Sequence, residues 1–246
     1  MSILDLVASR LSVNRRRLEA WLNARGIAHT LSLQRYLVHH RALPLLEAQV
    51  RGRCLDIGSG HGPYRETLDR VAERVITLDF ENRSSPVDVL ADVQAMPQVE
   101  SSSIDSVLCA QVLEHLPRPW DALAEIYRVL RPGGALILSV PHLSVIHEAP
   151  HDYFRYTRFG LESLMELAGL EVDRVEEAGG LLSFLLHPVS WFLLSATAGV
   201  PLLREIVWLL NYVFLIRLLG IFDRLVGAPR ISPCNYVVLA HKPGTR

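Results

Sequence analysis

The sequence predicts an α/β fold with a doubly wound, mostly parallel sheet, and three observations support this. Between residues 54 and 140, short apolar runs without polar alternation are separated by helical stretches, which is typical of strands covered on both faces. The first run, Cys54 to Ile57, ends in the alternating glycines Gly58, Gly60 and Gly62. Acidic or amide residues follow three later runs. Because ligands bind beyond the carboxyl ends of parallel strands, these features together predict a binding edge.

The elements follow one another in a regular order. Strands are expected at residues 54–57, 74–79, 87–90, 106–110, 135–140, 170–178 and 235–240. Helices are expected at residues 63–72, 120–130 and 157–168, the last with Thr157 as its N-cap. Residues 2–25 and 31–50 predict an N-terminal helical cap that is interrupted near Pro44. The chain therefore divides into a helical cap (1–50), a core (51–180), an apolar helical insertion (181–230) and a last strand of the core (231–246).

The composition excludes several classes of protein. Half of the 246 residues are apolar, which argues against disorder, and the net charge of −1 removes bulk attraction to nucleic acid. Cys54, Cys109 and Cys234 are widely spaced, and they form neither a disulfide framework nor a zinc-binding pattern. No basic start followed by an apolar core and a cleavage site is visible, so we expect a cytoplasmic protein.

Four polar features are expected at the carboxyl edge of the sheet: the glycine loop, Asp79, Asp92 and Gln111. A carboxylate at the end of the second strand can accept hydrogen bonds from both hydroxyls of a ribose, which suits Asp79. A carboxylate after the third strand can accept a hydrogen bond from the exocyclic amine of adenine, which suits Asp92. Taken singly, each aspartate is more often a helix cap or a solvated side chain, but their joint placement favours a ligand.

These residues resemble the class I S-adenosylmethionine-dependent methyltransferases, in particular the type 11 group related to the ubiquinone and menaquinone methyltransferases. The matching motifs occur in family order at residues 55–62, 78–79, 91–93, 105–108, 112–115 and 129–134. The resemblance covers residues 50–180 and resumes near residues 235–243. It implies a Rossmann-like sheet of seven strands in which the last strand is antiparallel, with the apolar insertion between strands six and seven.

The resemblance also implies which residues bind S-adenosylmethionine. Asp56 and the glycine loop would surround its methionine part, and Asp79 its ribose. Asp92 and Val93 would contact its adenine, and Gln111 would lie near its amino acid end. The cofactor contacts expected on this basis are Asp56, Gly58, Ser59, Gly60, Gly62, Asp79, Phe80, Asp92, Val93 and Gln111.

Two other ligand classes fit less well. A dinucleotide-binding loop has its third glycine three positions after the second, whereas Gly60 and Gly62 are two positions apart. Aminopropyl transferases resemble this fold and use a related sulfonium. They would be expected to have an acidic pair after the fourth strand to hold a polyamine, and Gln111 with Val112 does not supply it.

Methyl transfer from a sulfonium is an in-line displacement, so a general base is needed only if the acceptor must lose a proton. The segment after the fifth strand, residues 141–156, is rich in His and Tyr and would lie at the ligand edge. We predict as candidate bases His147 and His151, with His115 as a third. The predicted acceptor contacts are His142, Asp152, Tyr153 and Tyr156. Alternatively, residues 152–156 only fix the entry to the next helix, and the spacing does not predict a metal site.

The segment between the sixth and seventh strands is unusually apolar. Residues 181–203 contain no ionisable side chain other than His187, and the charges of residues 202–226 are scattered around the helical circumference. A helix that is apolar on nearly all sides must be buried in protein or lipid. Three partners stay open: a membrane surface or lipid-like acceptor, a second subunit of a homo-oligomer, or the core of the same chain. The arginines of residues 1–48 favour the first.

Together these features predict an enzyme that transfers a methyl group from S-adenosylmethionine to a small, hydrophobic or lipid-linked acceptor. The alternative is a catalytically silent, cofactor-binding scaffold at a membrane or in an oligomer. We expect a cytoplasmic location, peripheral on the inner face of the membrane if residues 181–226 contact lipid, and no nucleic acid as a partner.

Overall fold

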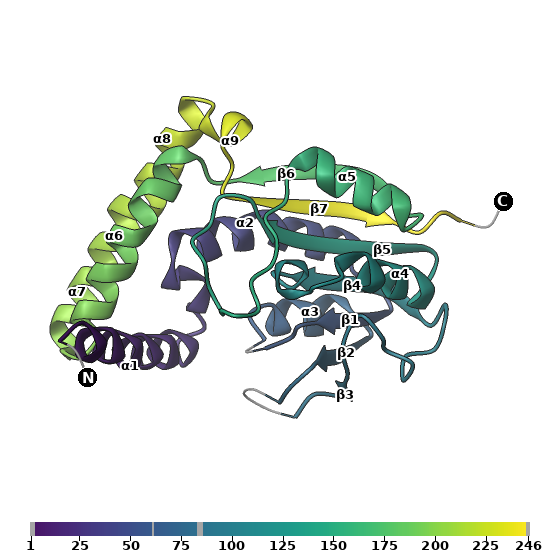
Figure 1. Ribbon diagram of the computed structural model, residues 1–246, viewed down its shortest axis with the longest axis horizontal. Helices are drawn as coiled ribbons and strands as arrows, with labels where there is room; N and C mark the ends of the chain where they lie inside the picture. The colour runs from purple at the N-terminus through teal and green to yellow at the C-terminus, as the bar shows by residue number, and fades with distance from the viewer. Residues whose placement is uncertain (1–2, 61, 83–85, 245–246) are drawn as a thin grey trace. The chain divides into compact units, whose positions relative to one another are not determined.

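A seven-stranded sheet in the order β3-β2-β1-β4-β5-β7-β6 is the centre of one of two units (Figure 1). The structure, a computed structural model, describes residues 3–60, 62–82 and 86–244. The sheet unit comprises residues 40–177 and 235–246, and the helical unit comprises residues 1–39 and 178–234. Residues 1–39 of the predicted cap thus belong to the same unit as the predicted insertion.

The sheet confirms the predicted fold class. Its strands are β1 (Arg53–Ile57), β2 (Arg74–Asp79), β3 (Val89–Leu90), β4 (Ile104–Ala110), β5 (Leu130–Pro141), β6 (Glu171–Ala178) and β7 (Asn235–His241). The pairs β1 with β2, β1 with β4, β2 with β3, and β4 with β5 are parallel, and β7 runs antiparallel to β5. The carboxyl ends of β1 to β5 therefore share one edge.

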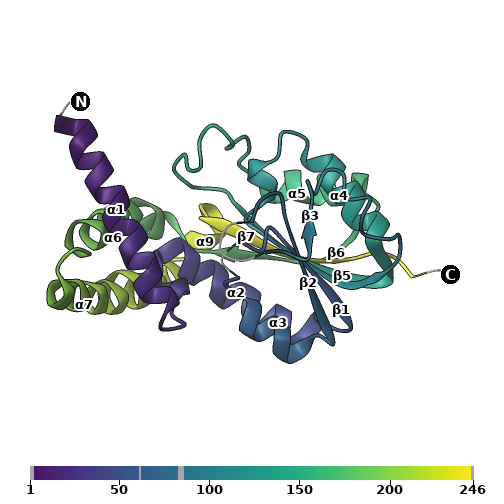
Figure 2. The ribbon, with the colours of Figure 1, turned by 90° about the horizontal axis from the view of Figure 1, so that it is seen from below.

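Helices cover both faces of this sheet. Figure 2 shows α4 (Pro119–Val129) and α5 (Arg158–Leu167) on one face and α3 (Arg65–Val71) on the other. The apolar stripe of α4 is fully buried, and it consists of Ala122, Leu123, Ile126 and Val129. At the start of α5, Thr157 is the N-cap that the sequence predicts, because its hydroxyl oxygen accepts a hydrogen bond from the Gly160 N–H at 3.1 Å.

The predicted helical cap is present, but one detail of it is wrong. Helix α1 (Ile3–Asn23) is one helix of 21 residues. Helix α2 (Leu33–Gln49) continues through Pro44. Pro44 is exposed, so the carbonyl that loses its N–H partner there can be hydrated and the helix continues.

The rest of the helical unit follows β6. It consists of α6 (Leu181–Thr197), α7 (Pro201–Leu210), the π-helical η3 (Asn211–Leu218), α8 (Leu219–Leu225) and α9 (Ala228–Ile231), together with the 3-10 turn η1 (Ala28–Leu31). Residues 201–225 form one uninterrupted helical stretch. Among the described residues, Pro201–Asp223 is long and apolar enough to cross a membrane, with a mean hydropathy of 1.8 and only 17% of its most apolar window buried.

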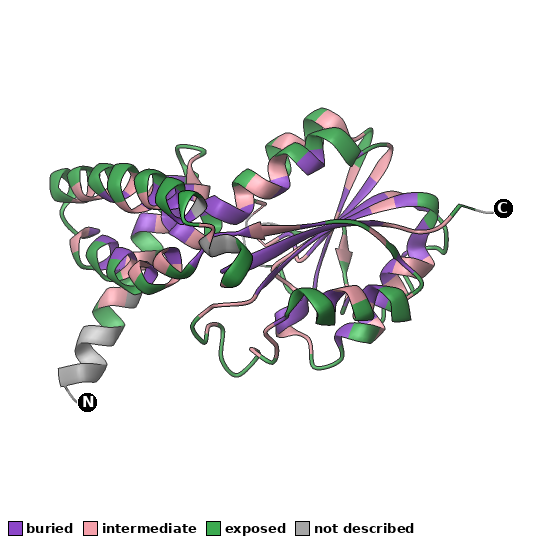
Figure 3. Ribbon diagram, turned by 90° about the horizontal axis from the view of Figure 1, so that it is seen from above, coloured by how far each residue is buried: buried purple, intermediate pink, exposed green. Residues whose placement is uncertain are grey.

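Several polar side chains of the helical unit are buried, whereas many of its large apolar side chains are exposed. Its buried polar residues include Ser183, His187, Ser190, Ser195, Asn211 and Asp223. Its exposed large apolar residues include Leu185, Phe192, Leu202, Ile206, Leu209, Leu210, Phe214, Leu218, Phe222 and Leu225. In Figure 3, where exposed residues are green, α7 is green along much of its length, whereas α6 has exposed, intermediate and buried residues in turn.

Candidate functional site

The loop after β1 approaches the end of β4 closely. Gly58, Gly60 and Gly62 have φ values of 66°, 49° and 63°, in the left-handed region that favours glycine. A Cβ atom on Gly58 would lie 2.3 Å from the Cγ2 atom of Val112, in the segment after β4. The sequence position of Gly58 therefore requires glycine. His61, in the same loop, lies outside the described residues.

Asp79, at the end of β2, holds the glycine loop. Its buried carboxylate accepts a hydrogen bond from the Gly60 N–H at 3.0 Å. The N–H groups of Gly58 and Ser59 point to the Leu78 carbonyl oxygen at 2.8 and 3.3 Å. The predicted ribose acid and the predicted cofactor loop thus lie within one hydrogen bond of each other.

Asp56 lies in β1 below the loop and is 5% exposed. Burial raises the pKa of its carboxyl to about 7, an effect that Arg65 opposes and Asp79 reinforces. A buried acid of this kind becomes charged readily when a cation binds beside it. The position therefore suits the cationic end of an amino acid ligand.

The predicted adenine contacts follow the short strand β3. Asp92 is exposed, and its Oδ1 atom accepts a hydrogen bond from the Gln94 N–H at 2.8 Å. Val93 is buried in the core of the sheet unit. Phe80, next to Asp79 in the chain, is 64% exposed. An aromatic ring that faces solvent beside a carboxylate can cover a planar base.

Gln111 joins the ends of β4 and β5. Its φ of 56° is uncommon for a residue with a side chain. Its backbone N–H donates to the Ser139 carbonyl at 2.9 Å, and its side-chain amide donates to the Ser139 hydroxyl at 3.3 Å. Strained backbone of this kind is frequent at ligand sites. Together with the contacts of Gly58 and Asp79, it connects the ends of β1, β2, β4 and β5 into one edge.

An ion pair fixes the segment after β5. Two guanidinium nitrogens of Arg155 donate to the two carboxylate oxygens of Asp152 at 2.6 and 2.8 Å. These hydrogen bonds lower the pKa of Asp152 to about 2. The Asp152 carboxylate also accepts the backbone N–H of His147 at 2.9 Å. The ion pair therefore fixes the backbone of one candidate base.

The other predicted acceptor contacts divide into anchored and exposed side chains. Tyr156 is buried and its hydroxyl donates to the Leu113 carbonyl at 2.8 Å. The Nδ1 atom of His142 lies 2.8 Å from the Tyr156 carbonyl oxygen. Tyr153 is 46% exposed, and its N–H donates to the Glu114 carbonyl at 2.8 Å. Tyr153 is thus the more accessible of the two tyrosines.

Glu114 was given no role on sequence grounds, yet it lies between two candidate bases. It belongs to the 3-10 turn η2 (Leu113–His115) after β4 and is fully buried. Its Oε1 atom lies 3.7 Å from Nε2 of His115 and 4.0 Å from Nε2 of His147. Burial raises the pKa of its carboxyl to about 8, an effect that Arg155 partly offsets. A glutamate in an apolar segment, directly before His115, is the signal that could have found it.

The third candidate base, His151, contributes its backbone to this cluster. Its carbonyl oxygen lies 2.6 Å from Nδ1 of His115. Its own ring is exposed, with Nδ1 at 3.4 Å from the Tyr153 hydroxyl. The structure therefore brings His115 and His147 together around Glu114 and leaves the His151 ring facing solvent.

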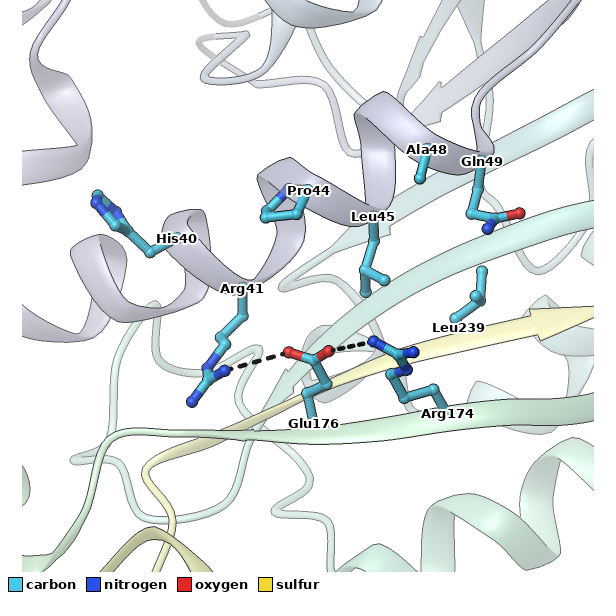
Figure 4. A pocket seen from close by; sticks show the side chains of 9 residues that line it. All are labelled: His40, Arg41, Pro44, Leu45, Ala48, Gln49, Arg174, Glu176 and Leu239. Atoms are coloured by element: carbon cyan, nitrogen blue, oxygen red, sulfur yellow. Dashed lines mark hydrogen bonds and ion pairs between the residues drawn. The ribbon is translucent and has the colours of Figure 1, made fainter. Parts of the chain in front are cut away.

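A cavity of 320 Å³ lies elsewhere in the sheet unit, against α2, β6 and β7 (Figure 4). Arg41 and Arg174 on its wall both pair with Glu176, at 3.5 and 3.1 Å. The charges on the cavity wall are thus largely paired with one another. Because no predicted site residue lines it, we place the candidate site at the strand edge.

Comparison with known proteins relates part of the chain to methyltransferases. Residues 55–138 match the family Methyltransf_11, described as a methyltransferase domain. The chain is 33% identical over 136 residues to a Mycolicibacterium smegmatis protein named "Probable S-adenosylmethionine-dependent methyltransferase", which covers 48% of this chain and 52% of that protein. It is 31% identical over 100 residues to the ubiquinone biosynthesis O-methyltransferase of Xanthomonas oryzae pv. oryzae, covering 35% and 42% of the two chains. The chain spans about half the length, or less, of these curated relatives.

A solved structure shares the fold. The 1,6-didemethyltoxoflavin-N1-methyltransferase of Burkholderia thailandensis, with 1,6-didemethyltoxoflavin and S-adenosylhomocysteine bound, superposes with a TM-score of 0.54. The superposition covers 82% of this chain and 77% of that one at 16% identity. At this identity the likeness concerns the fold alone.

Proposed function

We propose that this chain transfers a methyl group from S-adenosylmethionine to a hydrophobic or lipid-linked acceptor at a membrane surface. Its residues 55–138 match the methyltransferase domain Methyltransf_11. The donor half of this proposal rests on the strand edge, and the acceptor half rests on the helical unit. When bound, S-adenosylmethionine supplies an electrophilic methyl group. The protein has to hold donor and acceptor in line and exclude water.

The hydrogen bond between Gly60 and Asp79 supports the donor site best. It brings a carboxylate and a loop without side chains to the same strand edge, where a ribose and an amino acid chain can bind. The absent side chain of Gly58 lets the loop pack against Val112, which follows β4, and so holds the loop at this edge. The proposed cofactor contacts remain Asp56, Gly58, Ser59, Gly60, Gly62, Asp79, Phe80, Asp92, Val93 and Gln111.

Replacement of Asp79 tests the donor site. We expect Asp79→Ala to weaken binding of S-adenosylhomocysteine by more than tenfold in calorimetry, or about 1.4 kcal/mol. Asp79→Asn keeps an acceptor for the Gly60 N–H and removes only the charge, so it separates loop distortion from ribose binding. The matched control is Asp69→Ala, which removes an exposed carboxylate on α3. Unchanged affinity in Asp79→Ala would contradict the ribose assignment.

The buried polar and exposed apolar side chains of the helical unit support a lipid partner. None of the ten residues of α7 is buried, all of them being described, whereas α6 buries Ser183, His187 and Ser190. In water the hydrophobic effect favours the opposite arrangement. An exposed apolar surface of this extent marks a protein or membrane interface. Because this apolar surface is left uncovered along the whole of α7, we favour lipid over a second subunit.

Charge supports the same partner. The exposed residues of α1 include Arg10, Arg16 and Arg17, which belong to the same unit as α6 and α7. Exposed arginines attract the anionic headgroups of a cytoplasmic leaflet. We therefore propose peripheral attachment to the inner face of the membrane, with the helices lying in the interface. The exposed Arg217 within Pro201–Asp223 makes a full span costly, which favours the surface position.

Vesicle flotation tests the attachment. We expect the full chain to float with vesicles that contain anionic lipid and to float less with purely zwitterionic vesicles. Replacement of Leu202, Ile206 and Leu209 by serine should reduce flotation more than tenfold, since these residues are 48–72% exposed. A chain that ignores vesicles and forms a stable dimer in light scattering would contradict the proposal and favour the homo-oligomer.

Turnover distinguishes an enzyme from a silent scaffold. We expect release of S-adenosylhomocysteine when the protein, S-adenosylmethionine and a membrane lipid extract are combined. Alanine at His147, His151 or His115 identifies the general base by a fall of about 10²–10⁴ in rate. Retained cofactor binding without product in any lipid fraction would favour the scaffold.

A further inference from the structure

We propose that Glu114, His115 and His147 bind a divalent cation of the zinc class. One ligand atom from each residue can be chosen so that all three lie within 4.8 Å of one another. Glu114 is fully buried, and within the described part of the chain neither of its carboxylate oxygens has a hydrogen-bond partner. A buried, unpartnered carboxylate is costly, so a binding partner is expected there.

The outer ring nitrogens of both histidines face carbonyl oxygens. Nδ1 of His115 lies 2.6 Å from the carbonyl oxygen of His151, and Nδ1 of His147 lies 3.1 Å from that of Val145. A carbonyl oxygen only accepts, so each Nδ1 carries the hydrogen. In the neutral ring the Nε2 atom is then an acceptor with a free lone pair.

Three acceptors thus converge on one point. The Nε2 atoms of His115 and His147 lie 3.7 and 4.0 Å from the Oε1 atom of Glu114. The cationic Arg155 acts on Glu114 at longer range, but its guanidinium is held by both oxygens of Asp152. A cation between the three acceptors would satisfy all of them at once.

The surroundings are those of a metal site. Histidine ligands of metals commonly donate their second ring N–H to a carbonyl or carboxylate, as both rings do here. Two imidazoles and one carboxylate are a ligand set of catalytic zinc, which leaves a fourth position open. In a tetrahedral site, ligand atoms about 2.1 Å from the ion lie about 3.4 Å apart. The two contacts to Oε1 therefore need contractions of about 0.3 and 0.6 Å, and the 4.8 Å bound needs a contraction of about 1.4 Å at most.

The site lies at the ligand edge of the sheet. Glu114 and His115 follow β4, and His147 follows β5. An ion with an open position there could bind an acceptor oxygen and lower the pKa of its hydroxyl. That catalytic role rests on the proposed function, whereas the binding site itself does not. Because His147 is supplied by a different strand end, spacing along the sequence does not reveal the site.

Titration with the metal alone tests the site. Full-length protein is stripped with a chelator, dialysed and titrated with Zn²⁺ in calorimetry, and we expect one site per chain. Cobalt(II) should give a d–d absorption band of a four- or five-coordinate ion. We expect Glu114→Gln and His147→Ala to weaken Zn²⁺ binding by at least tenfold and to lose the cobalt band. Because the His147 side chain is 35% exposed, His147→Ala is expected to fold even if Glu114→Gln does not.

The control is His241→Ala, which removes a histidine flanked by Glu171 and Asp173 at 3.2 and 3.0 Å, far along the chain from the cluster. It should leave Zn²⁺ affinity unchanged. The proposal is overturned if the stripped wild type binds no Zn²⁺ up to millimolar concentration, or if His147→Ala binds it as tightly as wild type. The proposal is also overturned if nitrogen NMR shows that the rings of His115 and His147 are doubly protonated and do not respond to Zn²⁺. A proton, and not a metal ion, would then occupy the site. S-adenosylhomocysteine affinity, measured separately, reports on the proposed function alone.

Discussion

The two units differ in how much of their apolar surface they bury. In the sheet unit, β7 buries every residue from Asn235 to Ala240, and the core includes leucine, valine and isoleucine from β1, β4 and β5. In the helical unit, most large apolar residues of residues 181–231 face outward. Its buried apolar residues form two small clusters, one of Leu18, Leu22, Leu31, Leu194 and Ala198 and one of Leu33, Tyr36, Leu37, Ala178 and Ile216. The sheet unit therefore has the side-chain distribution of a water-soluble domain. The helical unit has the side-chain distribution of a segment that contacts an apolar environment.

The largest expected effect comes from a comparison of two leucines. Leu138 in β5 is fully buried, whereas Leu209 in α7 is 52% exposed. We expect Leu138→Ala to lower the free energy of unfolding by about 2–5 kcal/mol, because it leaves a cavity. Leu209→Ala should change it by less than about 0.5 kcal/mol without lipid. Urea denaturation measures both, and equal losses would show that α7 is covered in solution, for example by a second subunit.

A second test uses a buried acid of the sheet unit. Burial raises the pKa of Asp56 from its ordinary 3.8 to about 7. The unfolded chain releases this proton at lower pH, so the free energy of unfolding falls between pH 4 and 7. The slope is at most about 1.4 kcal/mol per pH unit. Asp56→Asn should remove this fall in pH-dependent urea denaturation, while Asp69→Asn, at an exposed site, should keep it. A pH dependence that is identical in wild type and Asp56→Asn would contradict the shifted pKa.

The smallest test concerns a polar residue inside the helical unit. Asn211 is 3% exposed, and neither atom of its amide has a hydrogen-bond partner within the described residues. Replacement by leucine removes the cost of burying these atoms. Asn211→Leu should therefore raise the free energy of unfolding by about 1 kcal/mol in water. Asn211→Ala also removes the amide but adds no apolar volume, so it separates this gain from the added packing of the leucine side chain. Destabilisation by both variants would indicate that the Asn211 amide makes hydrogen bonds in the folded protein. Its burial would then not be evidence for an apolar environment around the helical unit.

The sheet was predictable because its signals are local. Unalternating apolar runs mark β1, β4 and β5, and the Thr157 cap lies within three residues of its donor. Sequence marks Glu114 only as a glutamate in an apolar segment before His115. Its proximity to His147 could not be predicted, because the two meet only after β4 and β5 are paired. The roles of the predicted cofactor and base residues stay predictions.

The helical unit was predictable only in its overall apolarity. Its inner contacts join distant residues: the Asp223 carboxylate accepts hydrogen bonds from the backbone N–H of Leu182 at 3.2 Å and of Ser183 at 2.9 Å, and from the Ser183 hydroxyl. This carboxylate satisfies the first turn of α6 from another helix. Because the pairing of helices decides which face of each one is inside, the inward polar face could not be read from one segment alone.

The place of β7 has a consequence for biosynthesis. It follows the other six strands of the sheet along the chain, yet it lies between β5 and β6. A ribosome delivers the chain from its N-terminus, so β6 has no neighbour in the sheet until residues 235–241 emerge. Residues 181–231 leave the ribosome before that moment. On the function proposed above, the nascent chain can therefore reach a bilayer while its sheet is still open, and targeting would precede completion of the enzyme.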